Sequence, residues 1–388
     1  MNRMEAYNVI VKILKRTNKR FRISNVWLSL LYWSGRYQSA VKFITISKPN
    51  EFVSMCWMGT IYYLSHELNL ARELFEKAKS LDRTSREITF LLAETYFSMS
   101  EIEKAEVLYR SLIPDPDFVF HGLYRTGCCL IELKRFDEAI SFFNRAISHA
   151  SGEDLVKTLN KKGLCLLNQQ LLEEATELFE KCLKLSPDNF SAKQNLALAA
   201  TKTKDHEKAV SLYKEILLKS PYDIIAINNL ALNTAALGNY SGAMELCNQG
   251  LSIDPLNPDL LANKGYCLYK LNDYKNALNC IIEAEKILKE DPILKNNKAL
   301  CLCALGDYKT AIQIFDELLN QQVSDDILFN KAFCLLKVGQ YREALDTLDK
   351  IEQKDDKKSD IYTIQSACYE KLGENDKAVA ILNKLLIA

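Results

Sequence analysis

The stretch "LANKGYCLYKLNDYKNAL", residues 261–278, decides the fold of this chain because its spacing recurs along almost the whole sequence. Taken alone, it has the composition of a reactive site, with Cys267 among lysines and tyrosines. Its Ala277, however, is one of a series of alanines, here called the anchor alanines. Eight of the nine steps between them are 34 residues or within one of it, and the remaining step is 36: Ala71, Ala105, Ala139, Ala175, Ala209, Ala243, Ala277, Ala311, Ala344 and Ala378. A repeat of this kind predicts a structural unit before it predicts a site.

Each anchor alanine stands in a constant frame of other residues. Twelve positions earlier comes Gly or Ala, as in Gly265, and five positions earlier Gly or Asn recurs, as in Asn272. Small residues let two helices approach closely. Gly and Asn tolerate the left-handed conformation in which helices commonly end. Each copy is therefore predicted to be a helix, a short turn and a second helix.

Three positions before the anchor an aromatic residue is frequent, as in Tyr274, and twelve positions after it three copies have proline: Pro187, Pro221 and Pro255. This frame resembles that of the tetratricopeptide repeat (TPR) family, whose period and small, aromatic and proline positions match it. The resemblance covers residues 21–388 and gives eleven copies, the first around Ala40. It implies an all-α fold, a right-handed superhelix or α-solenoid of antiparallel helix pairs, with an extended concave surface. We expect a basic amphipathic segment at residues 1–20, three degenerate repeats over 21–119, and eight well-formed repeats over 120–388 that continue from them.

Charge is balanced overall but unevenly distributed. The first 50 residues hold ten of the 50 basic residues and one of the 50 acidic ones, which leaves 40 basic and 49 acidic residues to the rest. Only residues 12–22 offer a surface suited to phosphate, so nucleic acid is not the expected partner. No apolar run reaches the roughly 18 residues that a membrane-spanning helix needs. Nor does the first stretch have the form of a secretory signal. We therefore expect a cytoplasmic protein without membrane insertion.

The twelve cysteines follow the repeat rather than a catalytic pattern. Six of them lie ten residues before an anchor alanine: Cys129, Cys165, Cys267, Cys301, Cys334 and Cys368. A catalytic thiol is not needed once per repeat, whereas a small apolar residue in a helix interface is. Cys128 and Cys303 fall outside this register and are predicted to be more exposed. No zinc-type spacing, phosphate loop or hydrolase motif is present in the sequence, so we expect no enzyme, metal or cofactor.

The candidate binding residues lie fourteen positions before the anchor alanines. Five consecutive copies have asparagine there, here called the asparagine ladder: Asn195, Asn229, Asn263, Asn297 and Asn330. Two upstream copies have Arg125 and Lys161. Three residues after the ladder come apolar side chains that share its face by helical spacing: Leu232, Tyr266, Leu300 and Phe333.

The TPR resemblance places the ladder on the concave surface. Asparagine both donates and accepts, so a row of it can bond the backbone of an extended peptide whatever the peptide's sequence. The arrangement is similar to the asparagine ladder in the TPR arm of O-GlcNAc transferase, and only that binding mode is expected to carry over. The predicted function is a protein-binding scaffold that holds an extended peptide or partner protein in this groove.

Two alternatives stay open. The asparagines could serve only local hydrogen bonding within the repeats. The chain could also be an assembly protein that self-associates or docks through its basic N-terminal segment and its apolar C-terminal helix, forming a homo-oligomer.

Overall fold

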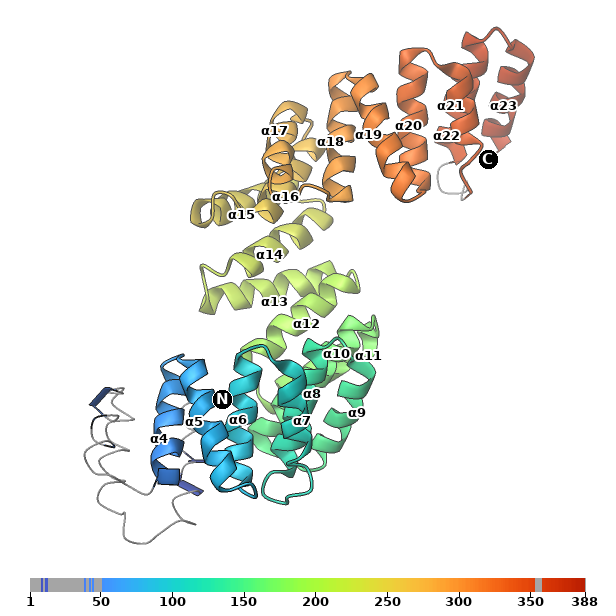
Figure 1. The fold of residues 1–388 in the computed structure, drawn as a ribbon. Coiled ribbons are helices and arrows are strands. Elements are labelled where there is room, and N and C mark those ends of the chain that lie inside the picture. The colour runs from blue at the N-terminus through green and yellow to red at the C-terminus, as the bar shows by residue number, and fades with distance from the viewer. Residues whose placement is uncertain are drawn as a thin grey trace. The chain divides into compact units, whose positions relative to one another are not determined.

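In the computed structural model, residues 51–352 and 358–387 are described, together with isolated positions before residue 50. Every regular element in this described part is an α-helix, and the twenty helices α4 to α23 form ten consecutive antiparallel pairs (Figure 1). The prediction of an all-α fold built from helix pairs is confirmed. The chain divides into two compact units, residues 1–199 and residues 200–388.

The N-terminal unit contains four pairs and the first helix of a fifth. Their bounds are α4 Glu51–Leu64, α5 Leu68–Leu81, α6 Arg86–Ser98, α7 Ile102–Arg110, α8 Val119–Glu132, α9 Phe136–Ile147, α10 Gly152–Asn168, α11 Leu172–Leu185 and α12 Phe190–Lys202. The last of these helices runs a few residues past the division between the units.

The C-terminal unit continues with the same alternation. Its helices are α13 His206–Lys219, α14 Ile224–Ala236, α15 Tyr240–Ile253, α16 Pro258–Lys270, α17 Tyr274–Glu285, α18 Pro292–Leu305, α19 Tyr308–Gln321, α20 Asp325–Val338, α21 Tyr341–Leu348, α22 Lys358–Lys371 and α23 Asn375–Ile387. Even-numbered helices are the first of each pair and odd-numbered helices the second.

The anchor alanines lie where the two helices of a pair touch. All are completely buried except Ala378, which is 7% exposed. The glycines twelve residues earlier face the bulky residue four positions after the anchor. A Cβ added at Gly163 would lie 2.6 Å from the ring of Phe179, and one at Gly127 would lie 2.6 Å from the ring of Phe143. The glycines of the repeat frame are therefore required by helix packing, since a larger side chain at these positions would clash with the facing ring.

The turn inside each pair has one left-handed residue five positions before the anchor. It is glycine or asparagine in the last five described copies, as predicted, with Asn272 at φ 64° and Gly306 at φ 88°. The five earlier copies place other residue types in the same conformation: His66, Ser100, Lys134, Gln170 and Lys204. The next residue closes the turn, and in the opening stretch the amide of Asp273 donates to the carbonyl of Leu268 over 2.9 Å.

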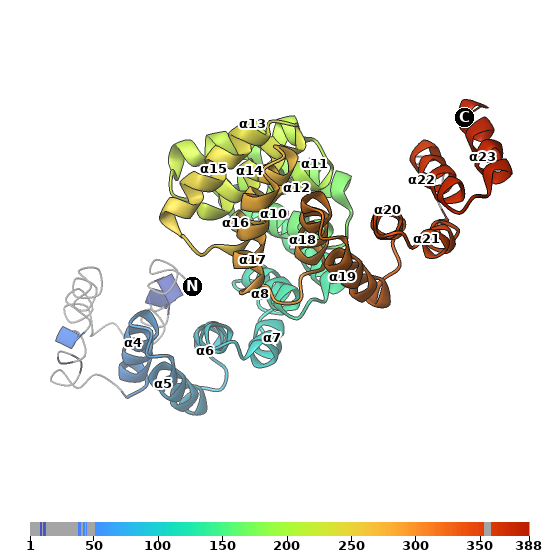
Figure 2. The ribbon, with the colours of Figure 1, turned by 90° about the horizontal axis from the view of Figure 1, so that it is seen from above.

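Within the C-terminal unit the first helices contact one another. α14 contacts α16, α16 contacts α18, α18 contacts α20 and α20 contacts α22, whereas successive second helices in the described part share no contact of that extent. Figure 2 shows α20 and α21 nearly end-on, with α19 and α22 on either side of that pair. Because the first helices approach more closely, they form the inner face of this unit and the second helices form its outer face.

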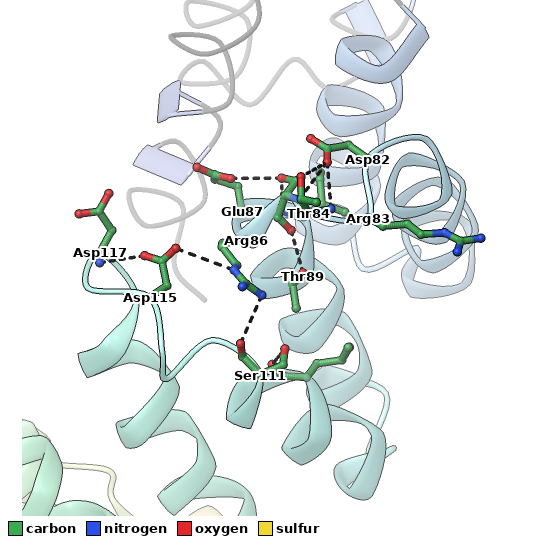
Figure 3. A network of polar contacts seen from close by, with 12 residues as sticks. Asp82, Arg83, Thr84, Arg86, Glu87, Thr89, Ser111, Asp115 and Asp117 are labelled. Carbon is green, nitrogen blue, oxygen red and sulfur yellow. Dashed lines mark hydrogen bonds and ion pairs between the residues drawn. The ribbon is translucent and has the colours of Figure 1, made fainter.

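Side-chain hydrogen bonds and ion pairs hold the loops between pairs in place, as the junction between α5 and α6 shows (Figure 3). Oδ1 of Asp82 accepts from the amide of Ser85, and the Ser85 hydroxyl in turn caps α6. Arg86, the first residue of α6, donates to the carbonyl of Ser111 at the end of α7 and lies 3.8 Å from Asp115 in the loop that follows. These contacts connect the loop before the α6–α7 pair with the loop after it.

Several predictions about the ends fall outside the described residues. They concern the basic segment at 1–20, the first of the eleven copies over 21–50, and the side chains that close the C-terminal helix. Of the isolated positions, Val9 is buried in the cluster that includes Phe118, and Nζ of Lys12 lies 4.9 Å from the centre of the Phe118 ring. The boundary proposed at 119/120 stays a prediction.

Candidate functional site

Four of the five ladder asparagines lie on successive first helices of the C-terminal unit. Asn229 is on α14, Asn263 on α16, Asn297 on α18 and Asn330 on α20, and all four are half-buried. Their apolar companions share the inner face: Leu232 and Phe333 are 42% and 37% exposed, and Tyr266 and Leu300 are half-buried. Asn195 is on α12, in the N-terminal unit.

Two of the ladder asparagines bond the preceding repeat. Nδ2 of Asn263 donates to Oδ1 of Asn228 over 2.8 Å, and Nδ2 of Asn195 donates to Oδ1 of Asn160 over 3.0 Å. The accepting asparagines stand one position before the ladder register in their own copies. This contact gives Asn195 and Asn263 a structural task, which was one of the two interpretations left open by the sequence.

The other three ladder positions differ. The side-chain amides of Asn229, Asn297 and Asn330 make no hydrogen bond to any other described residue. Next to Asn297, the buried Oδ1 of Asn296 has no partner in the described part either. The side chain of asparagine carries a donor and an acceptor, so these three can each offer both to a ligand backbone.

A pocket of about 470 Å³ opens on the inner face between α16, α18 and α20. Its volume lies within the range of ~300–1,000 Å³ that is typical of ligand sites. Its lining comes mainly from these three first helices: Tyr269, Leu300, Cys303, Ala304, Tyr308, Phe329, Asn330, Phe333 and Lys337. The structure therefore brings together three of the predicted binding residues, Leu300, Asn330 and Phe333, in one cavity.

The sequence-based selection missed the remaining pocket residues, although helical spacing offered a signal. Tyr269 and Cys303 lie three residues after Tyr266 and Leu300, and Lys337 lies four residues after Phe333. Residues three or four apart share a helix face, so the next turn of each first helix extends the same surface. Nζ of Lys337 lies 5.2 Å from the centre of the Phe333 ring.

The cysteines divide as their register predicts, with one exception. The six cysteines in the packing register are fully buried, and burial raises the pKa of Cys267, for example, to about 11. Cys303 is half-exposed, and a hydrogen bond with the thiol of Cys334 lowers its pKa. The prediction that Cys128 is exposed is wrong: it is 7% exposed, because its side chain packs into the cluster around Phe143, and burial raises its pKa.

The two predicted cationic positions lie on contacting first helices of the N-terminal unit. Nε of Arg125, on α8, is 2.8 Å from Oε1 of Glu94, which is 1% exposed and also accepts from the hydroxyl of Tyr109. An ion pair of this kind cannot lose one partner without stranding a buried charge. Lys161, on α10, is half-buried and has no ion-pair partner among the described residues.

Two structural features are absent among the described residues. No group of three or more His, Cys, Asp or Glu side chains has the geometry to hold a metal ion there. None of the helices in that part of the chain combines the length and apolar character needed to cross a bilayer.

The fold and the inner face define a helical-repeat protein of the solenoid class. Models of the tetratricopeptide repeat family match residues 120–150, 166–231 and 235–301. A model described as anaphase-promoting complex, cyclosome, subunit 3 matches residues 284–351 and 304–385. The chain is a tetratricopeptide repeat protein, and proteins of this family mediate protein–protein interactions.

Individual relatives are distant. The human protein O-mannosyl-transferase TMTC1 is 26% identical over 141 residues, which cover 36% of this chain and only 16% of that relative's length. A tetratricopeptide repeat protein from Parabacteroides merdae has a TM-score of 0.52 at 14% identity, covering 65% of this chain and 99% of its own. YrrB, described as a TPR protein with an unusual peptide-binding site, has a TM-score of 0.41 at 17% identity, covering 48% of this chain and 95% of its own.

Proposed function

We propose that this protein is a non-enzymatic scaffold that binds an extended segment of a partner protein along the first helices of its C-terminal unit. The observation that carries the proposal is the pocket in which Leu300, Asn330 and Phe333 meet. Repeat register, helical spacing and the TPR resemblance predicted that these residues share one face, and they line one cavity on the inner face.

In this proposal, the side-chain amides of the unbonded ladder asparagines bind the backbone of the partner segment. An extended chain presents a donor and an acceptor at each residue, and asparagine can satisfy both. Asn229, Asn297 and Asn330 are half-buried and make no hydrogen bond within the described chain. Asn263 keeps one donor on Asn228, so we assign it mainly to the stacking of repeats.

A scaffold is favoured over an enzyme because the residues on this face suit binding. The groove combines amides, aromatic rings and leucines, whereas catalysis needs a nucleophile or acid–base pair held next to one another. The relative TMTC1 is named as a mannosyl-transferase, but its matching region is a small part of its length and overlaps this repeat array.

The test selects 12-residue peptides that bind the immobilised full chain and measures their dissociation constants by fluorescence anisotropy. The triple variant N229A/N297A/N330A should weaken binding at least tenfold, since each hydrogen bond is worth about 0.5–1.5 kcal/mol. The matched control N248A/N279A/N320A removes three exposed asparagines from the outer helices α15, α17 and α19 and should leave binding unchanged. Equal affinities for both triple variants, with both folded, would contradict the proposal.

A further inference from the structure

The pocket on the inner face has an uncompensated positive charge at its rim. Lys337 is exposed, lines the pocket, and has no ion-pair partner in the described part of the chain. Two other lysines on α18 and α20 are paired: Nζ of Lys298 lies 2.6 Å from Glu285, and Nζ of Lys331 lies 2.6 Å from Asp316. The Lys337 ammonium thus remains available to an anionic group that enters from solvent.

The same arrangement occurs two repeats earlier, on α16. On α16, Nζ of Lys270 lies 5.5 Å from the centre of the Tyr266 ring, and Lys270 also lacks an ion-pair partner among the described residues. Each lysine follows its aromatic residue by four positions, so ring and ammonium lie on one helix face. An apolar surface with a cation at its edge therefore occurs on both α16 and α20, which flank α18.

The interior of the pocket is mostly apolar. Tyr269, Leu300, Phe329 and Phe333 supply its aromatic and aliphatic walls, and Asn330 supplies a side-chain amide. Such a cavity favours a bulky apolar side chain, because burying it removes apolar area from water. The nearby carboxylate, Asp307, is already engaged as the cap of α19, where it accepts from the amide of Thr310.

We propose, resting on the groove proposed above, that this pocket selects an apolar residue with an acidic residue two positions away in an extended peptide. In an extended chain, residues i and i+2 point to the same side. The apolar side chain fills the cavity against Phe333, and the neighbouring carboxylate pairs with Lys337. The partner is thus an acidic–apolar segment rather than any extended chain.

The test uses fluorescein-labelled 11-residue peptides of Gly and Ser with a central Leu and Asp at both positions two residues from it. Anisotropy with the full chain at low salt should show tightest binding for this parent peptide. Replacing both Asp by Asn should weaken binding about three- to fivefold, as expected for an exposed ion pair. Replacing the central Leu by Ala should weaken it at least fivefold, and F333A should abolish that difference.

Charge reversal gives the decisive comparison. The K337E variant should prefer a peptide with Lys in place of both Asp, whereas the wild type prefers Asp. The matched control K309E, on the outer helix α19, should keep the wild-type preference. Circular dichroism of each variant verifies that the chain remains folded.

Three results would overturn the inference: equal binding of the Asp and Asn peptides, no inversion in K337E, or no binding of the parent peptide at all. None of them decides the groove itself. If selected peptides still lose affinity in N229A/N297A/N330A, the groove stands and only its selectivity is wrong. The opposite result is also informative. If the parent peptide binds more tightly than its Asn and Ala versions while N229A/N297A/N330A binds the selected peptides normally, the pocket's selectivity is supported and the proposed role of the asparagines is wrong.

Discussion

The side-chain amide of Asn263 donates to Oδ1 of Asn228 over 2.8 Å, joining two successive first helices through residues 35 positions apart. The equivalent residue of the next repeat, Asn297, makes no such bond, because the position one before the ladder register in the preceding copy is Ala262. The asparagine ladder therefore contains residues of two kinds, which mutation can separate.

The first prediction concerns stability. Asn263→Ala should lower the free energy of unfolding by about 0.5–1.5 kcal/mol, because it removes the inter-repeat bond and leaves Asn228 unpaired. Asn297→Ala should change it by less than about 0.5 kcal/mol, as is usual away from such features. Urea denaturation followed by circular dichroism measures both, and equal losses would show that the Asn228 contact does not stabilise the stack.

The left-handed turn residues provide the second prediction. Lys204 has φ 61° and is exposed, so Lys204→Gly should raise stability by about 0.5–1 kcal/mol, since glycine adopts this conformation without steric cost. Gly306→Ala, where φ is 88°, should lower stability by about 1 kcal/mol. Thermal denaturation compares them, and destabilisation by Lys204→Gly would mean that the lysine side chain makes a contribution larger than the turn strain.

The third prediction concerns the close packing of helices beside the anchor alanines. Gly163→Ala places a Cβ 2.6 Å from the ring of Phe179 and should cost about 1–3 kcal/mol through overpacking. The second change Phe179→Leu should recover part of this loss, because Leu348 fills the same register position opposite Ala332. Denaturation of the single and double variants measures the coupling, and simple additivity of the two losses would contradict a direct clash.

The fourth prediction concerns the thiol in the pocket. The Cys334 hydrogen bond lowers the pKa of Cys303, while burial and Asp307 act in the opposite direction. The alkylation rate of Cys303 should therefore rise with pH through a midpoint below that of an ordinary thiol. Cys334→Ala should move this midpoint upward because the thiolate loses its donor. Iodoacetamide labelling followed by mass spectrometry at several pH values measures the midpoint, and an unchanged value in Cys334→Ala would refute the assigned cause.

The sequence predicted the repeat and its packing well because both depend on short-range spacing. The anchor alanines, the register cysteines and the turn at Asn272 follow from residue type and interval alone. The left-handed conformation of Lys134 and Lys204 could not be predicted from residue type. Lysine has no preference for that conformation, and only the closing of the turn imposes it.

The candidate site could be predicted only in part from the sequence. Asn195 and Asn263 bond an asparagine 35 positions earlier, and Asn297 has Ala262 at that distance. Asn330 makes no such bond although Asn296 stands one position before the register in the preceding copy, so the residue types alone do not determine which asparagine is bonded. The pocket depends on three helices meeting, so Tyr269 and Cys303 had no signal of their own beyond sharing a face with residues already selected. Cys128 was misplaced because register alone does not show that a neighbouring cluster covers it.

One measurement tests most directly whether a partner chain lies along the first helices. Cys303 lines the pocket on α18, and Cys280 lies on the outer helix α17; both are half-exposed. Alkylation rates of the two thiols are compared in the full chain, without and with a saturating selected peptide. The account predicts that the bound peptide slows labelling of Cys303 at least fivefold and leaves Cys280 unchanged. Slower labelling of Cys280 alone, or an unchanged rate for Cys303, would contradict it.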